Sequence, residues 1–152
     1  MERRLDVIIL LLTIAPILLQ LAVVHALSVN VVYQDQWRFV PLLEKAESSS
    51  VTIGDLLAPH NEHRIVFPRL LMLLLARATR YDTTAETFVV WVLMLLTLLL
   101  VRDMYIRDLG RSPRALMRFV PVAWLMFSLR AWEHFLMGFQ IAYALYLLGS
   151  VL

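Results

Sequence analysis

Long apolar runs alternate with shorter polar segments along this chain, which is the pattern of helices that cross a membrane. The first run covers residues 5–27, and about 20 residues suffice to cross a hydrocarbon core of about 30 Å. Runs at 85–101, 119–129 and 139–152 predict three further spanning helices, the last of them incomplete. The pattern therefore predicts an all-α integral membrane protein with about four transmembrane helices in a single domain. The incomplete last run indicates a fragment of a longer protein.

Residues 28–84 separate the first two runs and predict a loop outside the membrane that carries short juxtamembrane helices. Thr52 and Asp55 have the spacing of a capping box, which predicts a short helix that continues to Leu57.

An arginine-bearing apolar helix is predicted over 67–80, with Pro68 in its first turn. At 100° per residue its three arginines share one side, opposite a broad Leu and Met face; they are Arg69, Arg77 and Arg80. We expect an amphipathic helix in the headgroup plane, and the alternative is the first half of a broken spanning helix.

Composition strengthens the membrane interpretation. Apolar residues make up 61% of the chain and charged residues only 17%, which leaves too little polar surface to cover a soluble domain of 152 residues. The formal net charge is only +2 and the arginines are scattered, so nucleic acid is not expected as a partner. The chain has no cysteine, which excludes disulfides, thiolate nucleophiles and cysteine-ligated metals.

The distribution of arginine predicts the orientation of the chain. The N-terminus and the predicted 102–118 loop together hold seven of the fourteen basic residues. Basic residues favour the cytoplasmic side, so we expect a multi-pass protein whose N-terminus and 102–118 loop are cytoplasmic. The 28–84 loop and a short turn at 130–138 then face outward.

Three polar clusters fall on this outward side. The first is Tyr33–Arg38, the second is His60-Asn61-Glu62-His63-Arg64, and the third is Trp132-Glu133-His134, followed by Gly138, Phe139 and Gln140. Because the predicted topology places all three at one membrane face, they form the candidate site.

Asp35 has two interpretations. It is either a helix cap between interfacial aromatic residues, or a carboxylate near the headgroups that takes a proton from an attacking hydroxyl group. Glu133 and His134 fit a solvated turn and a wall of the site equally well.

His60, Glu62 and His63 have the spacing H-x-x-H with the glutamate between, which differs from the H-E-x-x-H of helical zinc proteases. A metal site at the two histidines, with a divalent cation, is one alternative. Binding of a phosphate by these histidines and Arg64 is the second, and a structural loop held by internal hydrogen bonds is the third.

Taken together, these motifs resemble the N-terminal part of bacterial multi-spanning glycosyltransferases of the C-type superfamily. The likeness lies in Asp35-Gln36-Trp37 after the first helix, in His60–Arg64 before the helix that carries Arg69, and in Trp132-Glu133-His134-Phe135 leading to Gly138-Phe139-Gln140. It covers nearly the whole chain, but only about the first third of such an enzyme.

The resemblance implies an inner-membrane enzyme, similar to dolichyl-phosphate-mannose mannosyltransferases, that transfers a sugar from a polyprenyl-phosphate carrier to an acceptor at the outer face. Asp35 would be the general base. The phosphate or substrate would be held by residues drawn from His60, Glu62, His63, Arg64, Arg69, Glu133, His134 and Gln140. Many relatives have two adjacent acidic residues where this chain has Gln34 and Asp35, so a second carboxylate must come from elsewhere, for example from Glu62.

Two other functions fit the same sequence. A non-catalytic small membrane protein, such as an assembly partner or a transport subunit, would tolerate alanine at Asp35, His60 and His63. A metal-dependent hydrolase would bind metal at His60 and His63.

Overall fold

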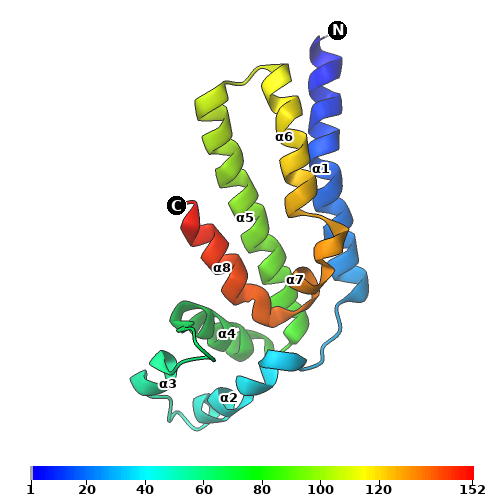
Figure 1. The fold of residues 1–152 in the computed structure, drawn as a ribbon. Coiled ribbons are helices and arrows are strands. Elements are labelled where there is room, and N and C mark those ends of the chain that lie inside the picture. Colours follow the sequence, from blue (N-terminus) through cyan, green and yellow to red (C-terminus); the bar gives the residue numbers. More distant parts are fainter. Residues whose placement is uncertain (1) are drawn as a thin grey trace.

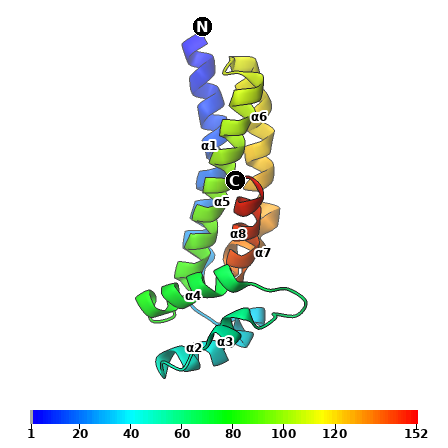
Figure 2. The ribbon, with the colours of Figure 1, turned by 90° about the vertical axis from the view of Figure 1, so that its left-hand side faces the viewer.

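The computed structural model describes residues 2–152, and these residues form helices and loops with no strand (Figures 1 and 2). The elements are α1 (Glu2–Leu27), η1 (Gln34–Arg38), α2 (Val40–Glu47), α3 (Ile53–Leu57), α4 (Val66–Thr79), α5 (Thr83–Leu109), α6 (Pro113–Met126), η2 (Leu129–Ala131), α7 (Trp132–Leu136), η3 (Gly138–Gln140) and α8 (Ile141–Ser150), where η marks a 3-10 helix. The all-α prediction is therefore confirmed.

The helices form two parts. α1, α5, α6 and α8 pack as an elongated bundle, and α2, α3 and α4 form a smaller layer at one end of it (Figure 1). α4 lies across the end of the bundle, roughly perpendicular to the long helices (Figure 2). The N-terminus and the turn between α5 and α6 lie together at the opposite end, and the C-terminus lies about halfway along the bundle (Figure 1).

Two helices are long and apolar enough to cross a membrane. α1 has 26 residues and α5 has 27, which correspond to lengths of about 40 Å. α6 has 14 residues and α8 has 10, so each is shorter than a hydrocarbon core of about 30 Å. By length alone, the structure supports two of the four predicted spans.

The segment predicted as a 102–118 loop is mostly helical instead. α5 continues to Leu109, α6 begins at Pro113, and the turn between them is only three residues long. Nothing breaks the helix before Gly110, which has φ +76°, and Asp103 forms an ion pair with Arg107 one turn further along. The arginine-rich composition that predicted a loop therefore belongs to the exposed ends of α5 and α6.

The short helices follow their capping signals. The backbone N–H of Asp55 donates to Thr52 Oγ1 at 3.2 Å, and the backbone N–H of Thr52 donates to Asp55 Oδ2 at 2.9 Å. The predicted capping box and the end of α3 at Leu57 are both confirmed. α4 begins with Pro68 in its first turn, and Arg80 ends it in the left-handed conformation at φ +58°.

The core joins the bundle to the layer at its end. Aromatic rings pack together within it: the centroids of Phe127 and Phe135 lie 5.5 Å apart, and Trp91 meets Phe127 edge-on at 6.2 Å. Met72 of α4 is fully buried in the same cluster. This packing fixes the layer, and the residues that it carries, against the ends of α5 and α8.

Candidate functional site

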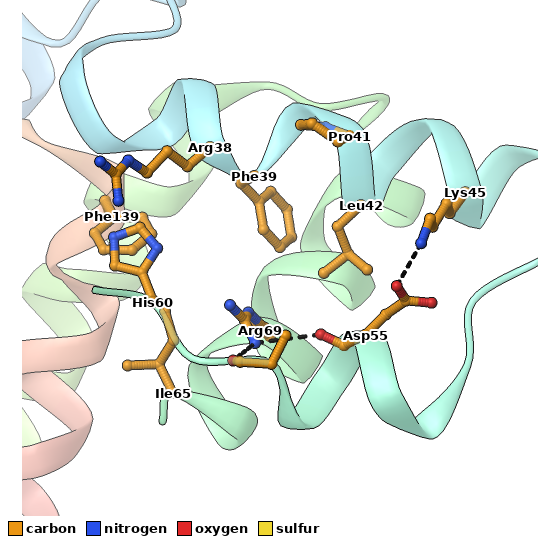
Figure 3. Close-up of a pocket in the computed structure, with 11 residues that line it drawn as sticks. Arg38, Phe39, Pro41, Leu42, Lys45, Asp55, His60, Ile65, Arg69 and Phe139 are labelled. Carbon is orange, nitrogen blue, oxygen red and sulfur yellow. Dashed lines mark hydrogen bonds and ion pairs between the residues drawn. The ribbon is translucent and has the colours of Figure 1, made fainter. Parts of the chain in front are cut away.

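Three segments that are distant in sequence meet around one cavity where the layer joins the bundle (Figure 3). The cavity has a volume of about 170 Å³ and we call it the His60 cavity. Its lining residues come from η1 and α2, from α3 and the loop before α4, from α4 itself and from η3; they are Arg38, Phe39, Pro41, Leu42, Lys45, Asp55, Ala58, His60, Ile65, Arg69 and Phe139. Basic side chains therefore predominate over acidic ones among its polar residues.

Asp35 and His60 face each other beside this cavity. Asp35 Oδ2 lies 3.9 Å from His60 Nε2, a separation that allows electrostatic attraction but is too long for a hydrogen bond. The His60 side chain is only 12% exposed, whereas that of Asp35 is 49% exposed. The ring of Phe139 covers His60 at a centroid distance of 4.6 Å (Figure 3). The carboxylate is thus open to a second molecule, and the imidazole is held in place.

The charge of His60 depends on opposing effects. Burial lowers the pKa of His60 below its ordinary value, the negative charge of Asp35 opposes this shift, and the positive charges of Arg38 and Arg69 add to it. The net direction is downward, so the neutral imidazole is favoured in the free protein.

A tight turn carries His60. The backbone N–H of His60 donates to the carbonyl of His63 at 2.7 Å, and the N–H of His63 donates back at 3.0 Å. Asn61 adopts φ +54° within the turn and accepts a hydrogen bond from Arg38 through its Oδ1. Gln34, next to Asp35, also has a positive φ of +47°. Asparagine adopts this backbone region more readily than glutamine does, so of the two it is Gln34, beside Asp35, that is the strained residue.

Arg69 is buried and has a structural task. Its Nη1 donates to the carbonyls of Asp55 at 3.2 Å and Leu56 at 3.0 Å, and also to that of Ala58. These carbonyls end α3, where a cation is favoured by the helix dipole. Lys45 donates to Asp55 Oδ1 at 2.5 Å, and this contact holds the pKa of Asp55 well below its ordinary value. Arg69 therefore lines the cavity while it fixes the loop around it (Figure 3).

The other residues predicted for the site do not line the cavity. Glu62, His63 and Arg64 are exposed along the turn that follows His60, and Gln140 is half-buried directly after Phe139. The exposed Glu133 and His134 belong to α7, where the His134 ring stacks on Tyr143 at 5.0 Å. Of the predicted residues, the structure brings Asp35, His60 and Arg69 together.

Four contributors were given no role from the sequence, although Arg38, Gln36 and Phe139 lie within the predicted clusters. Arg38 and Phe139 line the cavity, and Gln36 donates from Nε2 to Glu86 Oε2 at 2.7 Å in a buried contact beneath η1. Glu86 could have been singled out from the sequence, because burying a carboxylate at the start of a long apolar helix costs free energy unless it has a partner. Gln36 and Phe139 carried no signal beyond their place in the motifs.

No group of three or more histidine, aspartate or glutamate side chains in residues 2–152 is arranged to hold a metal ion. A larger groove of about 1050 Å³ lies between α2 and α4. Leu70, Leu73 and Leu74 line it together with Arg77 and Arg80, so one side of α4 changes from apolar to cationic along the groove.

The sequence matches no family model, and no characterised protein or solved structure is detectably similar to it. The site is therefore interpreted from its own geometry.

Proposed function

We propose that this chain is the N-terminal membrane part of a glycosyltransferase that transfers a sugar from a polyprenyl-phosphate carrier to an acceptor at the outer face of the cytoplasmic membrane. The observation that carries the proposal is the meeting of Asp35 with His60 beside a cavity whose wall includes Arg38 and Arg69. A carboxylate open to an acceptor and cations beside it are the two groups that this transfer needs.

The reaction would use these groups in a single displacement. The acceptor hydroxyl gives its proton to the Asp35 carboxylate as its oxygen attacks the anomeric carbon of the sugar. The bond between that carbon and the carrier phosphate breaks, and the phosphate leaves with the bonding electrons. Arg38 and His60 would stabilise the negative charge on the leaving phosphate.

Membrane integration belongs to the same proposal. α1 and α5 would cross the bilayer, and α6 and α8 would lie beside them as helices shorter than the hydrocarbon core. Exposed apolar side chains along the bundle support this arrangement, among them Leu11 at 62% exposure and Leu125 at 76%. The N-terminus and the α5–α6 turn, which share one end of the bundle, would be cytoplasmic (Figure 1).

The layer formed by α2, α3 and α4 would then lie at the outer membrane interface. The orientation of α4 across the end of the bundle supports this placement (Figure 2). The groove between α2 and α4 would receive the isoprenoid chain of the carrier along Leu70, Leu73 and Leu74. The carrier phosphate would lie toward Arg38 and His60 in the neighbouring cavity.

The test is Asp35→Asn in the full-length enzyme of which this chain would be the N-terminal part, assayed in membranes for sugar transfer from a polyprenyl-phosphate sugar. We expect transfer to fall by about 100-fold or more, because an amide cannot accept the hydroxyl proton. The matched control is Asp108→Asn, which removes an exposed carboxylate at the far end of α5 and should leave transfer unchanged. Retained transfer in Asp35→Asn, with equal protein abundance, would remove Asp35 from the role of base.

One observation favours the alternative of a non-catalytic membrane protein. Several basic side chains around the cavity are engaged internally: Arg38 with Asn61, Lys45 with Asp55, and Arg69 with the end of α3. A structural loop would use them in this way. The two functions separate at Asp35 and His60, because alanine at either position should leave a non-catalytic protein unaffected beyond its folding.

A further inference from the structure

Glu86 is a buried carboxylate in the first turns of α5. Glu86 is 1% exposed, and its Oε2 accepts a hydrogen bond from Gln36 Nε2. Gln36 is only 2% exposed. A hydrocarbon side chain would pack here without the cost of burying a charged or polar group. The carboxylate therefore has to be explained by what it binds.

Gln36 uses both ends of its amide. Its Oε1 accepts the backbone N–H of Tyr33 at 3.0 Å, while its Nε2 donates to Glu86. Asp35 lies between Tyr33 and Gln36 in the chain. The Gln36 side chain therefore closes the turn that carries Asp35 and also attaches this turn to α5.

Gly138 brings the third segment to the same point. A Cβ atom on Gly138 would lie 2.2 Å from Glu86 Oε2 and 2.8 Å from Gln36 Nε2, which is far too close for any side chain. The backbone of η3 therefore packs directly against the hydrogen-bonded pair. The next residue, Phe139, covers His60.

We infer that Glu86 is the positioning residue of the site: through Gln36 it holds Asp35, and through its contact with Gly138 it holds the Phe139 wall against His60. This inference rests on the proposed function, because it assigns to Glu86 the task of aligning Asp35, the proposed base, with the His60 cavity. Glu86 itself does not line the cavity. It acts through its hydrogen bond and not through contact with substrate.

The experiment measures amide hydrogen exchange in residues 33–38 and 137–140 of the detergent-solubilised protein. Glu86→Leu removes the acceptor, and we expect exchange in both segments to become roughly tenfold faster, as for the loss of one buried hydrogen bond. Glu86→Gln keeps an acceptor oxygen for Gln36 and should exchange near the unsubstituted rate. Sugar transfer should follow the same order, lost in Glu86→Leu and rescued in Glu86→Gln.

Thr97→Val is the matched control. Thr97 is also a buried polar residue of α5, but it bonds only the carbonyl of Leu93 and lies far from η1 along the helix, so its replacement should leave both segments protected. Gly138→Ala gives a second route if Glu86→Leu does not fold, because it displaces the pair without removing a polar group.

Two outcomes would overturn the inference: unchanged exchange in residues 33–38 of Glu86→Leu or Gly138→Ala, or exchange in Glu86→Gln as fast as in Glu86→Leu. Failure of the proposed function has a different signature. In that case the unsubstituted full-length protein that contains this part transfers no sugar, while the exchange pattern still responds to Glu86.

Discussion

His60 is a partly buried imidazole between the carboxylate of Asp35 and the ring of Phe139. Its neighbours pull its charge in opposite directions, because Asp35 favours the protonated ring whereas burial and the nearby arginines disfavour it. A phosphate placed beside it would add negative charge and favour protonation. His60 could therefore gain its positive charge when a phosphate binds.

The lowered pKa of His60 predicts an acid-dependent loss of stability. The unfolded chain takes up a proton at the ordinary value of 6.5, above the pKa of the folded protein. Between these two values the unfolded state binds more protons, so stability falls as the pH drops below about 6.5. We expect the decrease in melting temperature from pH 7.5 to pH 5.5 to be smaller in His60→Gln than in the unsubstituted protein.

Two further variants check the assignment to His60. His63→Gln changes the exposed histidine of the same turn and should keep the full decrease. Asp35→Asn removes the charge that opposes the shift and should enlarge it. An equal decrease in all four proteins would show that His60 does not cause it.

For single residues, the sequence predicted which side chains belong to the site better than it predicted their hydrogen-bond partners. The polar clusters contained Asp35 and His60, and the structure brings these two residues together. Their location at the outer membrane face stays a prediction. The Gln36–Glu86 hydrogen bond could not be predicted, because it joins residues 50 positions apart whose partners depend on how η1 packs on α5. Arg69 was expected to hold phosphate, and its bonds to the end of α3 depend on a loop path that composition does not encode.

Among the helices, α1 and α6 are joined at the proline in the middle of α1. Pro16 has no N–H, so the carbonyl of Leu12, four residues earlier, loses its usual partner within the helix. Trp124 of α6 donates its Nε1–H to this carbonyl at 2.9 Å. A defect within one helix thus becomes a specific contact with its neighbour.

This contact predicts that Trp124→Phe destabilises the bundle by about 1 kcal/mol, because it removes the bond and leaves the Leu12 carbonyl unpaired. Thermal or denaturant unfolding in detergent would measure the change. In a Pro16→Ala background the helix supplies its own N–H, so the same substitution should cost less. Trp132→Phe, at an exposed tryptophan with no such bond, is the control, and an equal cost there would contradict the role of Trp124.

Helix ends were predictable where a capping residue marks them. Thr52 gave the start of α3, whereas the end of α5 was placed eight residues early because arginines were interpreted as a loop. Charged residues are good helix formers, so charge alone does not end a helix, and Gly110 was the better signal.

For the molecule as a whole, the two ends of the bundle differ in character. One end carries the N-terminus and the three-residue turn between α5 and α6, and the other carries the His60 cavity (Figure 1). The arginine distribution predicted that these two ends face opposite sides of a membrane, and that orientation stays a prediction. The apolar runs at 119–129 and 139–152 already predicted short helices, and the structure differs mainly in starting α6 earlier, at Pro113.

Cysteine labelling in intact cells tests the orientation, and the chain offers a clean background because it has no cysteine of its own. Ser49→Cys, in the layer that carries the site, should react with a membrane-impermeant maleimide added outside. Ser112→Cys, in the α5–α6 turn, should react only after the cells are opened. The reverse pattern would place the cavity in the cytoplasm and remove the proposed outer-face reaction.

The position of η3 has a consequence for how the protein is made. Gly138 and Phe139 complete a cavity whose other walls come from residues 38–69, so a ribosome must finish almost the entire segment before the pocket can close. Until then the hydrogen-bonded side chains of Gln36 and Glu86 lack the backbone of Gly138 that packs against them. A nascent chain released before residue 138 would contain α1 and α5 and yet have no closed His60 cavity.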